Sequence, residues 1–161
     1  MAEQIHLVSA PMVYKKDKNK DGILWFLVKE DKDGDWEVPK TAARTGESSV
    51  RAAVRSMGEQ GGMRIKVLEE VGRHGGAAKV GNKVLTQRVI YYLIAHKEGN
   101  EVLEYAESEW VEHSLALRRV TAKRDREMLK SARVLLNEIR AKKRKAREAE
   151  KAKEKAAANA S

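Results

Sequence analysis

The residue types that indicate chemistry in this chain are carboxylates and basic side chains, and their spacing is most informative between residues 36 and 63. The chain has no cysteine, which excludes disulfides, thiolate metal sites and cysteine nucleophiles. Its four histidines are scattered without metal-ligand spacing, and the Gly-x-Ser-x-Gly elbow of serine hydrolases does not occur. The segment 36–63 instead combines carboxylates, basic side chains and glycines. We therefore look for the chemistry of this protein in that segment.

Segment 36–63 resembles the Nudix box, whose family pattern is G-x5-E-x7-R-E-U-x-E-E-x-G-U, with U an apolar residue. The spacing is kept from Thr41 to Met63 without an insertion. The matching positions are Glu47, Arg55, Met57, Glu59, Gly62 and Met63. Three positions depart from the pattern: Thr41 stands at the first glycine, and Ser56 and Gln60 replace two glutamates.

The flanks of the box extend the resemblance over most of residues 5–139. Val38-Pro39-Lys40 is the usual lead-in, and Glu109-Trp110-Val111 followed by a leucine-bearing helix is similar to the later segment of the family. The resemblance implies an α/β fold, a Nudix-type α/β/α sandwich around a mixed β-sheet in which the box forms a loop, a helix and a loop. It places a Nudix-like domain at residues 1–139, followed by a C-terminal basic Ala/Lys/Glu-rich extension, helical or disordered, at residues 140–161.

The chemistry implied by the resemblance is cleavage of a nucleoside diphosphate linked to another moiety, with Mg²⁺ or Mn²⁺ as cofactor. Such cations neutralise phosphate charge and activate water, and Mg²⁺ prefers oxygen ligands. Acids at helical spacing i, i+3 and i+4 share one face and can converge on a metal. The metal positions of the family fall on Ser56, Glu59 and Gln60, and only Glu59 has a carboxylate. Serine and glutamine offer neutral oxygens, which lack the charge that holds Mg²⁺ and the basicity that activates water.

Two functional hypotheses follow. In the first, the protein is a pseudoenzyme, a weakly active or inactive scaffold that binds a nucleotide, a polyphosphate or RNA. In the second, it is an active Mg²⁺-dependent pyrophosphohydrolase in which Glu59 and Arg55 are catalytic and acids from elsewhere complete the site. The available acids are Glu47, Glu69, Glu70, Glu101 and Glu104. A chance match of the box on an ordinary helix is a third alternative.

Arg55 matches the family's arginine, so the resemblance predicts that it pairs with an acid and orients the box helix. Glu47 is a possible partner. The alternative is a solvent-exposed ion pair that contributes little to stability.

Candidate substrate-binding residues are basic side chains in or after the box: Lys40, Arg44, Arg73, Lys79 and Lys83. Residues 72–82 are rich in Gly and Lys, and we predict a loop there. It lacks the Gly-Lys-Ser/Thr ending of a P-loop. We interpret it as a mobile hairpin loop, with contact to a polyanion as the alternative.

The net charge of +9 is concentrated at the C-terminus. Residues 140–161 hold nine Lys/Arg and three Glu, a net of +6, which leaves +3 for the rest of the chain. A basic tail favours polyanions through counterion release, so the candidate nucleic-acid-binding residues are Lys142, Lys143, Arg144, Lys145 and Arg147. The alternative is a solvated helix of alternating charge that only increases solubility.

The elements that must position these residues follow from periodicity and turn signals. Strands are predicted at residues 5–14, 23–29, 64–71, 84–96 and near 110–111, with Pro11 marking a bulge or an edge. The Asp-Gly at the end of residues 15–22 indicates a hairpin turn between strands, rather than an EF-hand loop. Helices are predicted at residues 47–60 and 124–140, and beyond 140 the apolar stripe is lost, so we expect a marginal, frayed helix.

No apolar stretch has the roughly 18 residues that a transmembrane helix needs. Residues 1–9 lack the basic and apolar regions of a signal peptide. We therefore expect a cytoplasmic protein without a membrane partner. The sequence does not indicate the oligomeric state.

Overall fold

The computed structural model describes residues 5–102 and 104–160. Its strands are β1 (Ile5–Lys16), β2 (Ile23–Lys29), β3 (Thr41–Ala42), β4 (Arg64–Val80), β5 (Lys83–Glu98) and β6 (Glu107–Glu112). They form one sheet in the order β4-β5-β1-β2-β6, with the short β3 beside β1. β1 and β5 are parallel and the other neighbours are antiparallel, so the sheet is mixed, as the resemblance implied.

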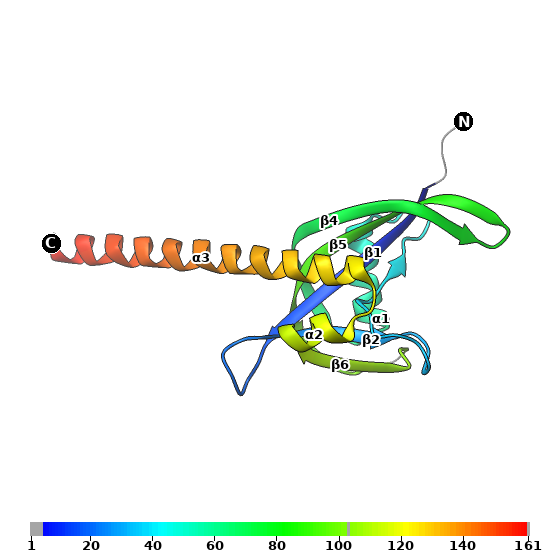
Figure 1. Cartoon of the computed structure of the whole chain (residues 1–161). Helices are drawn as coiled ribbons and strands as arrows, with labels where there is room; N and C mark the ends of the chain where they lie inside the picture. The colour runs from blue at the N-terminus through cyan, green and yellow to red at the C-terminus, as the bar shows by residue number, and fades with distance from the viewer. Residues whose placement is uncertain (1–4, 103, 161) are drawn as a thin grey trace.

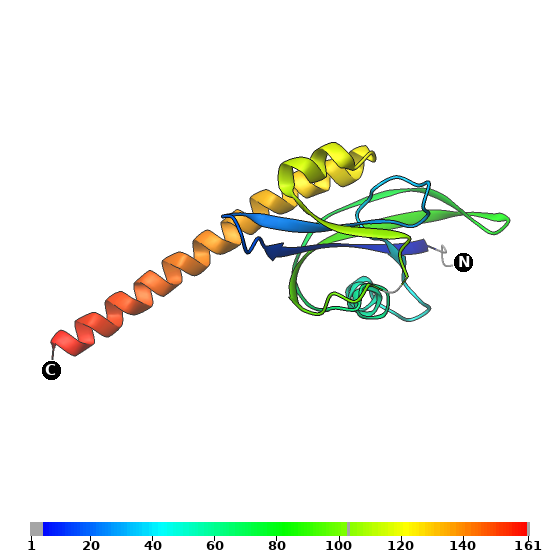
Figure 2. The same ribbon diagram turned by 90° about the horizontal axis from the view of Figure 1, so that it is seen from below.

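Helices cover both faces of the sheet (Figure 1). The helix α1 (Ser49–Glu59) lies on one face, and α2 (His113–Arg119) and the start of α3 (Lys123–Asn159) lie on the other. Figure 2 shows these layers edge-on, with the sheet between them. The α/β/α sandwich expected from the sequence is confirmed.

Two hydrophobic layers hold the helices to the sheet, and the alternation of the strands separates them. In β5, Tyr91 and Leu93 face the layer that contains Leu129 and Leu136 of α3. Ile90, Tyr92 and Ile94 face the layer that contains Met57 of α1. Because successive side chains of a strand point to opposite faces, a sheet covered on both sides is buried along its whole width.

The turn between β1 and β2 is the predicted hairpin connection, since strands flank it on both sides. The Asp17 amide donates to the Gly22 carbonyl at 3.1 Å and closes the turn. Pro11 lies in a strand that pairs with β5 along most of its length. On its other edge, β1 pairs with β3 at Val8 and Ser9 and with β2 from Tyr14 onward, so Pro11 falls between these two ladders. The missing amide hydrogen is tolerated there because no neighbouring strand requires it.

The predicted loop at residues 72–82 is wrong. β4 continues to Val80, and β4 and β5 form a long hairpin with register pairs from Arg64–Glu98 to Val80–Lys83. Only residues 81 and 82 form the turn, where Gly81 has φ +63°. The ladder is made by backbone groups, so glycines such as Gly75 and Gly76 can take part although they lack strand-forming side chains.

Helix α3 begins at Lys123, close to the predicted residue 124, and continues to Asn159, so the helical extension expected beyond residue 140 is confirmed. Up to Leu136 its stripe is buried against the sheet, and residues 142–160 are exposed. The extension projects away from the body of the protein as one continuous helix (Figure 1). Alanine, lysine and glutamate have high helix propensity, and the docked first half provides the nucleus that an isolated helix lacks. The described part of the chain has no helix with the length and hydropathy of a transmembrane segment.

Candidate functional site

The box folds as a loop, the helix α1 and a tight turn. Ser48 caps α1, and its Oγ accepts the Arg51 amide at 3.2 Å. Helix α1 is anchored to the sheet by its buried residues Ala52, Ala53 and Met57, and by a 2.5 Å hydrogen bond between Ser49 Oγ and Tyr92 Oη. These contacts fix the orientation of the helix and so determine which of its side chains face solvent.

The turn after α1 requires glycine at position 62. Gly62 has φ +60°, and a Cβ atom there would lie 1.9 Å from the Glu101 carbonyl oxygen. Both the left-handed backbone and the close approach of another chain segment exclude a side chain. The backbone conformation and the nearby Glu101 carbonyl therefore explain why the box has glycine at this position.

Arg55 and Glu47 form an ion pair with two hydrogen bonds within the box. Arg55 donates from Nε to Glu47 Oε2 at 2.8 Å and from Nη2 to Glu47 Oε1 at 2.9 Å. The Arg44 amide also donates to Glu47, at 3.0 Å. The Arg55 guanidinium and this amide lower the pKa of Glu47 to about 2. These two hydrogen bonds connect α1 to the loop before it. This arrangement is consistent with the prediction that Arg55 pairs with an acid and orients the box helix.

The three side chains at the metal positions of the box do not converge. Ser56 is 1% exposed, and its Oγ donates back to the Ala53 carbonyl at 3.2 Å. Gln60 accepts the Tyr105 hydroxyl through Oε1 at 3.1 Å. Glu59 is exposed and lies 3.6 Å from Arg44 and 3.7 Å from Arg55. One carboxylate, already next to two arginines, is left at these positions.

Mg²⁺ in proteins usually takes one or two carboxylates together with waters and substrate phosphates. The donor set of the box fits such a cation poorly, because its one carboxylate at these positions already lies beside two arginines. Of the acids considered from the sequence, Glu47 is held by Arg55, and Glu70 pairs with Arg73 on β4. Glu101 contributes its backbone to the turn at Gly62. Among residues 5–102 and 104–160, no group of three or more His, Cys, Asp or Glu side chains could hold a metal ion.

A second polar cluster links the lead-in of the box to α3. Asp125 is 1% exposed, and it accepts the Lys40 ammonium at 2.8 Å, the Tyr91 hydroxyl at 2.5 Å and the Val38 amide at 3.2 Å. Lys40 also donates to the Val38 carbonyl. Burial and the Asp125 carboxylate raise the pKa of Tyr91, which stays a neutral donor. Three donors compensate this buried carboxylate and fix the chain that enters the box.

Sequence reasoning missed Asp125. A signal was present, because Asp125 precedes Leu129, Ala132 and Leu136 of α3 by four, seven and eleven residues. That spacing places it on the apolar stripe of the helix, where an acid needs a buried partner. Tyr105, which contacts Gln60, carried no comparable signal.

The family model of the NUDIX domain matches residues 6–132 of the chain. The chain belongs to the Nudix family. The match covers both flanks of the box as well as the box itself, so a chance resemblance on a single helix is excluded. No curated protein matches the chain in sequence.

Solved structures share the fold of this Nudix domain at low sequence identity. An Ap4A hydrolase of C. elegans, in a binary complex, is 17% identical, with a TM-score of 0.66 over 82% of this chain and 98% of the other. The E. coli ORF135 protein is 19% identical, with a TM-score of 0.62 over 83% and 91%. The NUDIX domain of Shewanella oneidensis NrtR, complexed with ADP ribose, is 14% identical, with a TM-score of 0.61 over 84% and 90%.

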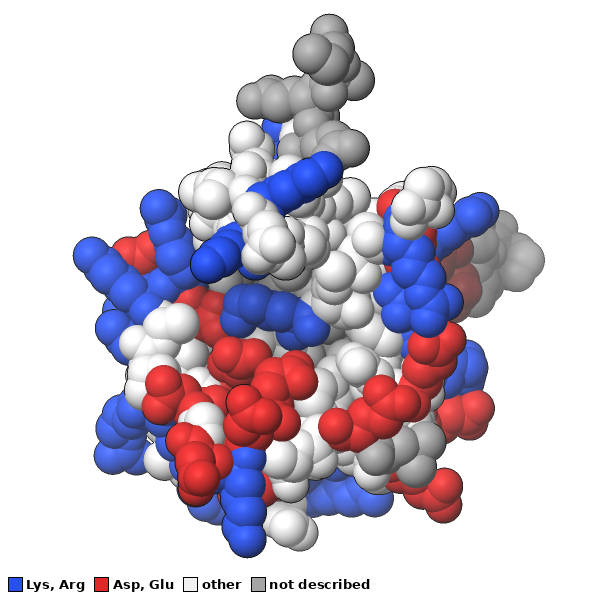
Figure 3. All heavy atoms as spheres, turned by 90° about the vertical axis from the view of Figure 1, so that its right-hand side faces the viewer, with Lys and Arg blue, Asp and Glu red and all other residues white. Residues whose placement is uncertain are grey.

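Charged side chains crowd the end of the Nudix domain where the box loop and the β2–β3 connection meet (Figure 3). Acids gather on the lower part of this face. The β2–β3 connection contains five acids, which are Glu30, Asp31, Asp33, Asp35 and Glu37. Burial raises the pKa of Glu30, Asp31 raises it further, and Lys40 lowers it. Burial also raises the pKa of Glu37, and Lys40 opposes this effect. A ligand rich in phosphate needs compensating cations at such a face.

A hollow of about 370 Å³ lies beside the box loop of the Nudix domain. It is lined by residues 5–7, 43–47 and Leu85, so it brings Arg44 together with the first residues of β1 and β5. Its volume is in the range of small-molecule sites. It does not include the three metal positions of the box.

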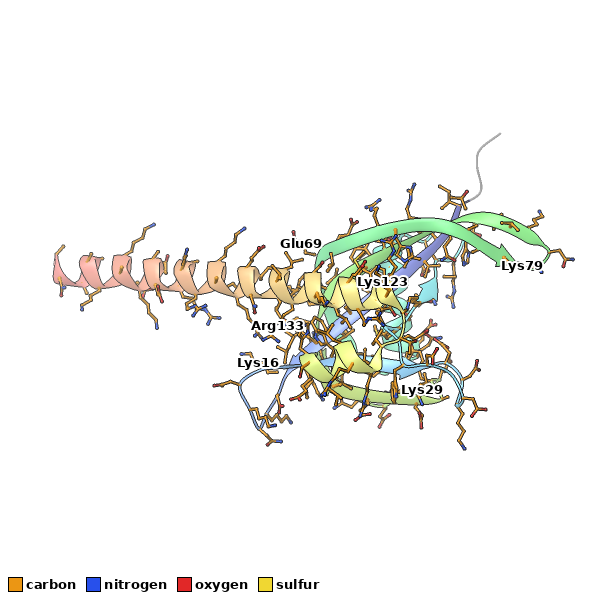
Figure 4. All side chains as sticks on the ribbon, viewed as in Figure 1. Lys16, Lys29, Glu69, Lys79, Lys123 and Arg133 are labelled. Atoms are coloured by element: carbon orange, nitrogen blue, oxygen red, sulfur yellow. The ribbon has the colours of Figure 1, made fainter. Side chains whose placement is uncertain are left out.

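The candidate substrate-binding residues do not form one cluster in the Nudix domain. Lys40 is engaged by Asp125, and Arg44 contacts Glu59. Arg73 pairs with Glu70 on its own strand. Lys79 lies near the far end of the β4–β5 hairpin (Figure 4), and Lys83 begins β5 beyond the turn. The candidate nucleic-acid-binding residues 142–145 and 147 all lie on the exposed part of α3, and they are separate from the box.

Proposed function

We propose that this Nudix domain binds a nucleotide or a polyphosphate and hydrolyses it weakly or not at all. The observation that carries the proposal is the state of the metal positions. Ser56 is buried and hydrogen-bonded within its helix, Gln60 is hydrogen-bonded to Tyr105, and Glu59 lies beside two arginines. A site with this donor set lacks the charge that holds Mg²⁺ against water and the base that activates a nucleophile.

The ligand class is suggested by the fold neighbours. One of them is an Ap4A hydrolase, and another is a NUDIX domain complexed with ADP ribose. We propose linked nucleoside phosphates of this kind as the first ligands to test, with Arg44 in the hollow beside the box as a phosphate contact. Lys40, Arg73, Lys79 and Lys83 remain candidate contacts, and the cytoplasmic location remains a prediction.

The competing hypothesis is an active pyrophosphohydrolase with Mg²⁺ or Mn²⁺ as cofactor. One observation favours it: Glu47 and Glu59 both contact Arg55, so two carboxylates lie next to one guanidinium. Binding of a metal would have to release both acids from the arginine. Glu59 and Arg55 would then be the catalytic residues.

A phosphate-release assay with Mg²⁺ and then Mn²⁺ separates the two hypotheses. The substrates are nucleoside triphosphates, ADP-ribose, dinucleoside polyphosphates and nucleotide sugars, and each is also tested for binding by calorimetry. We expect binding of at least one of these ligands, with turnover no higher than that of the Glu59→Gln variant. Turnover well above that variant would instead establish the enzyme, and absence of both binding and turnover would reject both hypotheses.

We also propose that the C-terminal extension binds RNA, because its cations are exposed on a helix that projects from the body. Such binding depends on phosphate contacts and decreases steeply with salt. Deletion of residues 142–161 is expected to abolish binding of a single-stranded RNA at low salt. Unchanged affinity after the deletion, or affinity independent of salt, would contradict the proposal.

A further inference from the structure

A basic groove lies where α3 leaves the domain, at the end of the molecule away from the box. It has a volume of about 590 Å³, and it is lined by Lys16 at the end of β1, Lys97 near the end of β5, Tyr14 and four residues of α3, which are Arg140, Lys143, Arg144 and Arg147. Figure 4 shows Lys16 on the side of the body from which α3 extends. The groove thus combines cations of the folded domain with cations of the extension.

The positive charge of this groove is not compensated by the protein. Within residues 5–102 and 104–160, none of its six Lys and Arg side chains forms an ion pair with a carboxylate. The arginines of the box and of β4, in contrast, are paired with glutamates. Six unpaired cations around one groove repel one another and attract counterions, which an anionic ligand releases when it binds.

The four α3 residues of the groove share one face of the helix. Arg140, Lys143, Arg144 and Arg147 follow the spacing i, i+3, i+4 and i+7, which aligns them along roughly 10 Å of helix at 1.5 Å per residue. Lys142 and Lys145 lie between them in sequence but do not line the groove. The helix therefore presents three arginines and one lysine to the groove, and two lysines outside it.

The shape and chemistry of the groove fit a chain of phosphates. Arginine forks bind phosphate oxygens in a bidentate manner, and a row of cations along a helix suits a ligand with repeated charges better than a single anion. Tyr14 adds an aromatic side chain, and the Arg140 guanidinium lies 5.7 Å from its ring centroid. A positively charged groove with an aromatic wall is typical of sites for single-stranded nucleic acid. Beyond Arg140 the helix has no apolar face that could insert into a membrane.

We propose that this groove binds the phosphate backbone of a single-stranded RNA, with Lys16 and Lys97 of the domain and one face of α3 as the phosphate contacts. The inference rests on the RNA binding proposed for the extension and names its site. It adds residues of the domain that the sequence did not indicate, and it removes Lys142 and Lys145 from the contacts. It is independent of the ligand of the box.

The test compares two charge-matched variants of α3 in the full chain. The groove variant carries Arg140→Gln, Lys143→Gln, Arg144→Gln and Arg147→Gln. The control carries Lys142→Gln, Lys145→Gln, Lys151→Gln and Lys153→Gln, which removes the same charge outside the groove. Glutamine keeps a high helix propensity, and circular dichroism verifies that both variants stay helical. A third variant, Lys16→Gln with Lys97→Gln, tests the contribution of the domain.

Affinity for a labelled poly(U) strand is measured over a range of salt concentrations. For a single strand, the logarithm of the binding constant falls with the logarithm of salt concentration with a slope of about −0.7 per phosphate contact. Six contacts therefore predict a slope of about −4 for the wild type, and the two contacts left in the groove variant predict about −1.4. We expect the groove variant to bind more than about tenfold more weakly at low salt, the control less than about threefold, and the domain variant to fall between them. Inorganic polyphosphate and single-stranded DNA serve as competitors, since they share the phosphate chemistry, and failure of either to displace the RNA would contradict a phosphate-backbone site.

The outcomes separate the groove from the extension. An equal loss in the groove variant and the control, or no loss in the domain variant, would overturn the groove while RNA binding by the extension stands. Absence of RNA binding by the wild type would overturn both. Binding to vesicles of anionic lipid in place of RNA would also overturn the proposal.

Discussion

Arg55 and Glu47 are joined by two parallel hydrogen bonds of 2.9 and 2.8 Å, which connect the box helix to the loop that precedes it. Both side chains are mostly shielded, at 18% and 15% exposure. The resemblance to the family predicted an orienting pair at these positions, and the structure gives the pair its geometry. Its role in stability can be tested apart from any catalytic role.

We predict that Arg55→Lys lowers the melting temperature, because a lysine ammonium cannot form both bonds of the fork. Arg51→Lys is the matched control, since Arg51 is exposed on the same helix. Thermal unfolding at neutral pH measures both. Equal melting temperatures for the two variants would mean that the fork does not stabilise the box.

The same pair predicts an acid dependence of stability. The pKa of Glu47 falls from an ordinary value of 4.5 to about 2 in the folded protein. The stabilisation is therefore complete above about pH 4.5 and is lost as the pH falls towards 2. Glu47→Gln removes this titration, so its stability should change less than that of the wild type across this interval. Parallel stability curves for the two proteins in urea unfolding would contradict the assignment.

Asp125 and Lys40 should behave as a coupled pair. Asp125 is buried whereas the Lys40 side chain is 27% exposed, so loss of Lys40 leaves the buried charge without its partner, a change that costs about 3–5 kcal/mol for a buried pair. We predict a loss of this order for Lys40→Met and a smaller loss for Asp125→Asn, which keeps an acceptor for Tyr91. In a double-mutant cycle, Lys40→Met with Asp125→Leu should cost less than the sum of the single changes. Additive losses in denaturant unfolding would show that the two side chains act independently.

Two glycines of the box region should respond in opposite ways to alanine. Gly62→Ala places a Cβ atom against the Glu101 carbonyl and requires a strained backbone, so we predict a loss of about 2–4 kcal/mol. Gly58 lies inside α1, where nothing is within 4 Å of a new Cβ. Gly58→Ala should therefore gain up to about 1 kcal/mol from helix propensity. A stable Gly62→Ala variant would reject the steric explanation for this glycine of the box.

Restoring the missing acids should create a metal-binding protein. Ser56→Glu combined with Gln60→Glu adds two carboxylates beside Glu59, and one of them begins at a buried position. We predict that the double variant melts at a lower temperature without metal and is stabilised by Mg²⁺, since the cation compensates the crowded acids. The wild type should show no such shift. Gain of Mg²⁺-dependent hydrolysis would show that the loss of acids is local, whereas an identical response of both proteins to Mg²⁺ would reject the prediction.

The fold class followed from local features of the chain. The spacing of the box, the apolar strands at residues 23–29 and 84–96, and the stripe of the helix from residue 124 each depend on neighbours within one element. Such patterns predict the element directly, because side-chain periodicity follows from local backbone geometry. The hairpin turn within residues 15–22 was predicted for the same reason.

The extents of β4 and α3 depend on contacts that lie outside these segments. Residues 72–80 carry few strand-forming side chains, and they become a strand only because β5 supplies their hydrogen-bond partners. The sequence left open whether residues 140–161 are helical or disordered, because the apolar stripe marks where a helix packs and not where it ends. In both cases the determining contact or the helix nucleus lies outside the segment itself.

For the box, too, some features follow from the sequence and others only from the tertiary structure. The sequence by itself determined that two acids are missing, since this is a matter of residue identity. Only the tertiary structure decided that Ser56 is buried, that Gln60 is bonded to Tyr105 and that Asp125 holds the lead-in of the box. It also brought Lys16 and Lys97 next to Arg140, although more than forty residues separate each from the next along the chain. Proximity of this kind arises from the packing of β1, β5 and α3, which no local pattern of residues specifies.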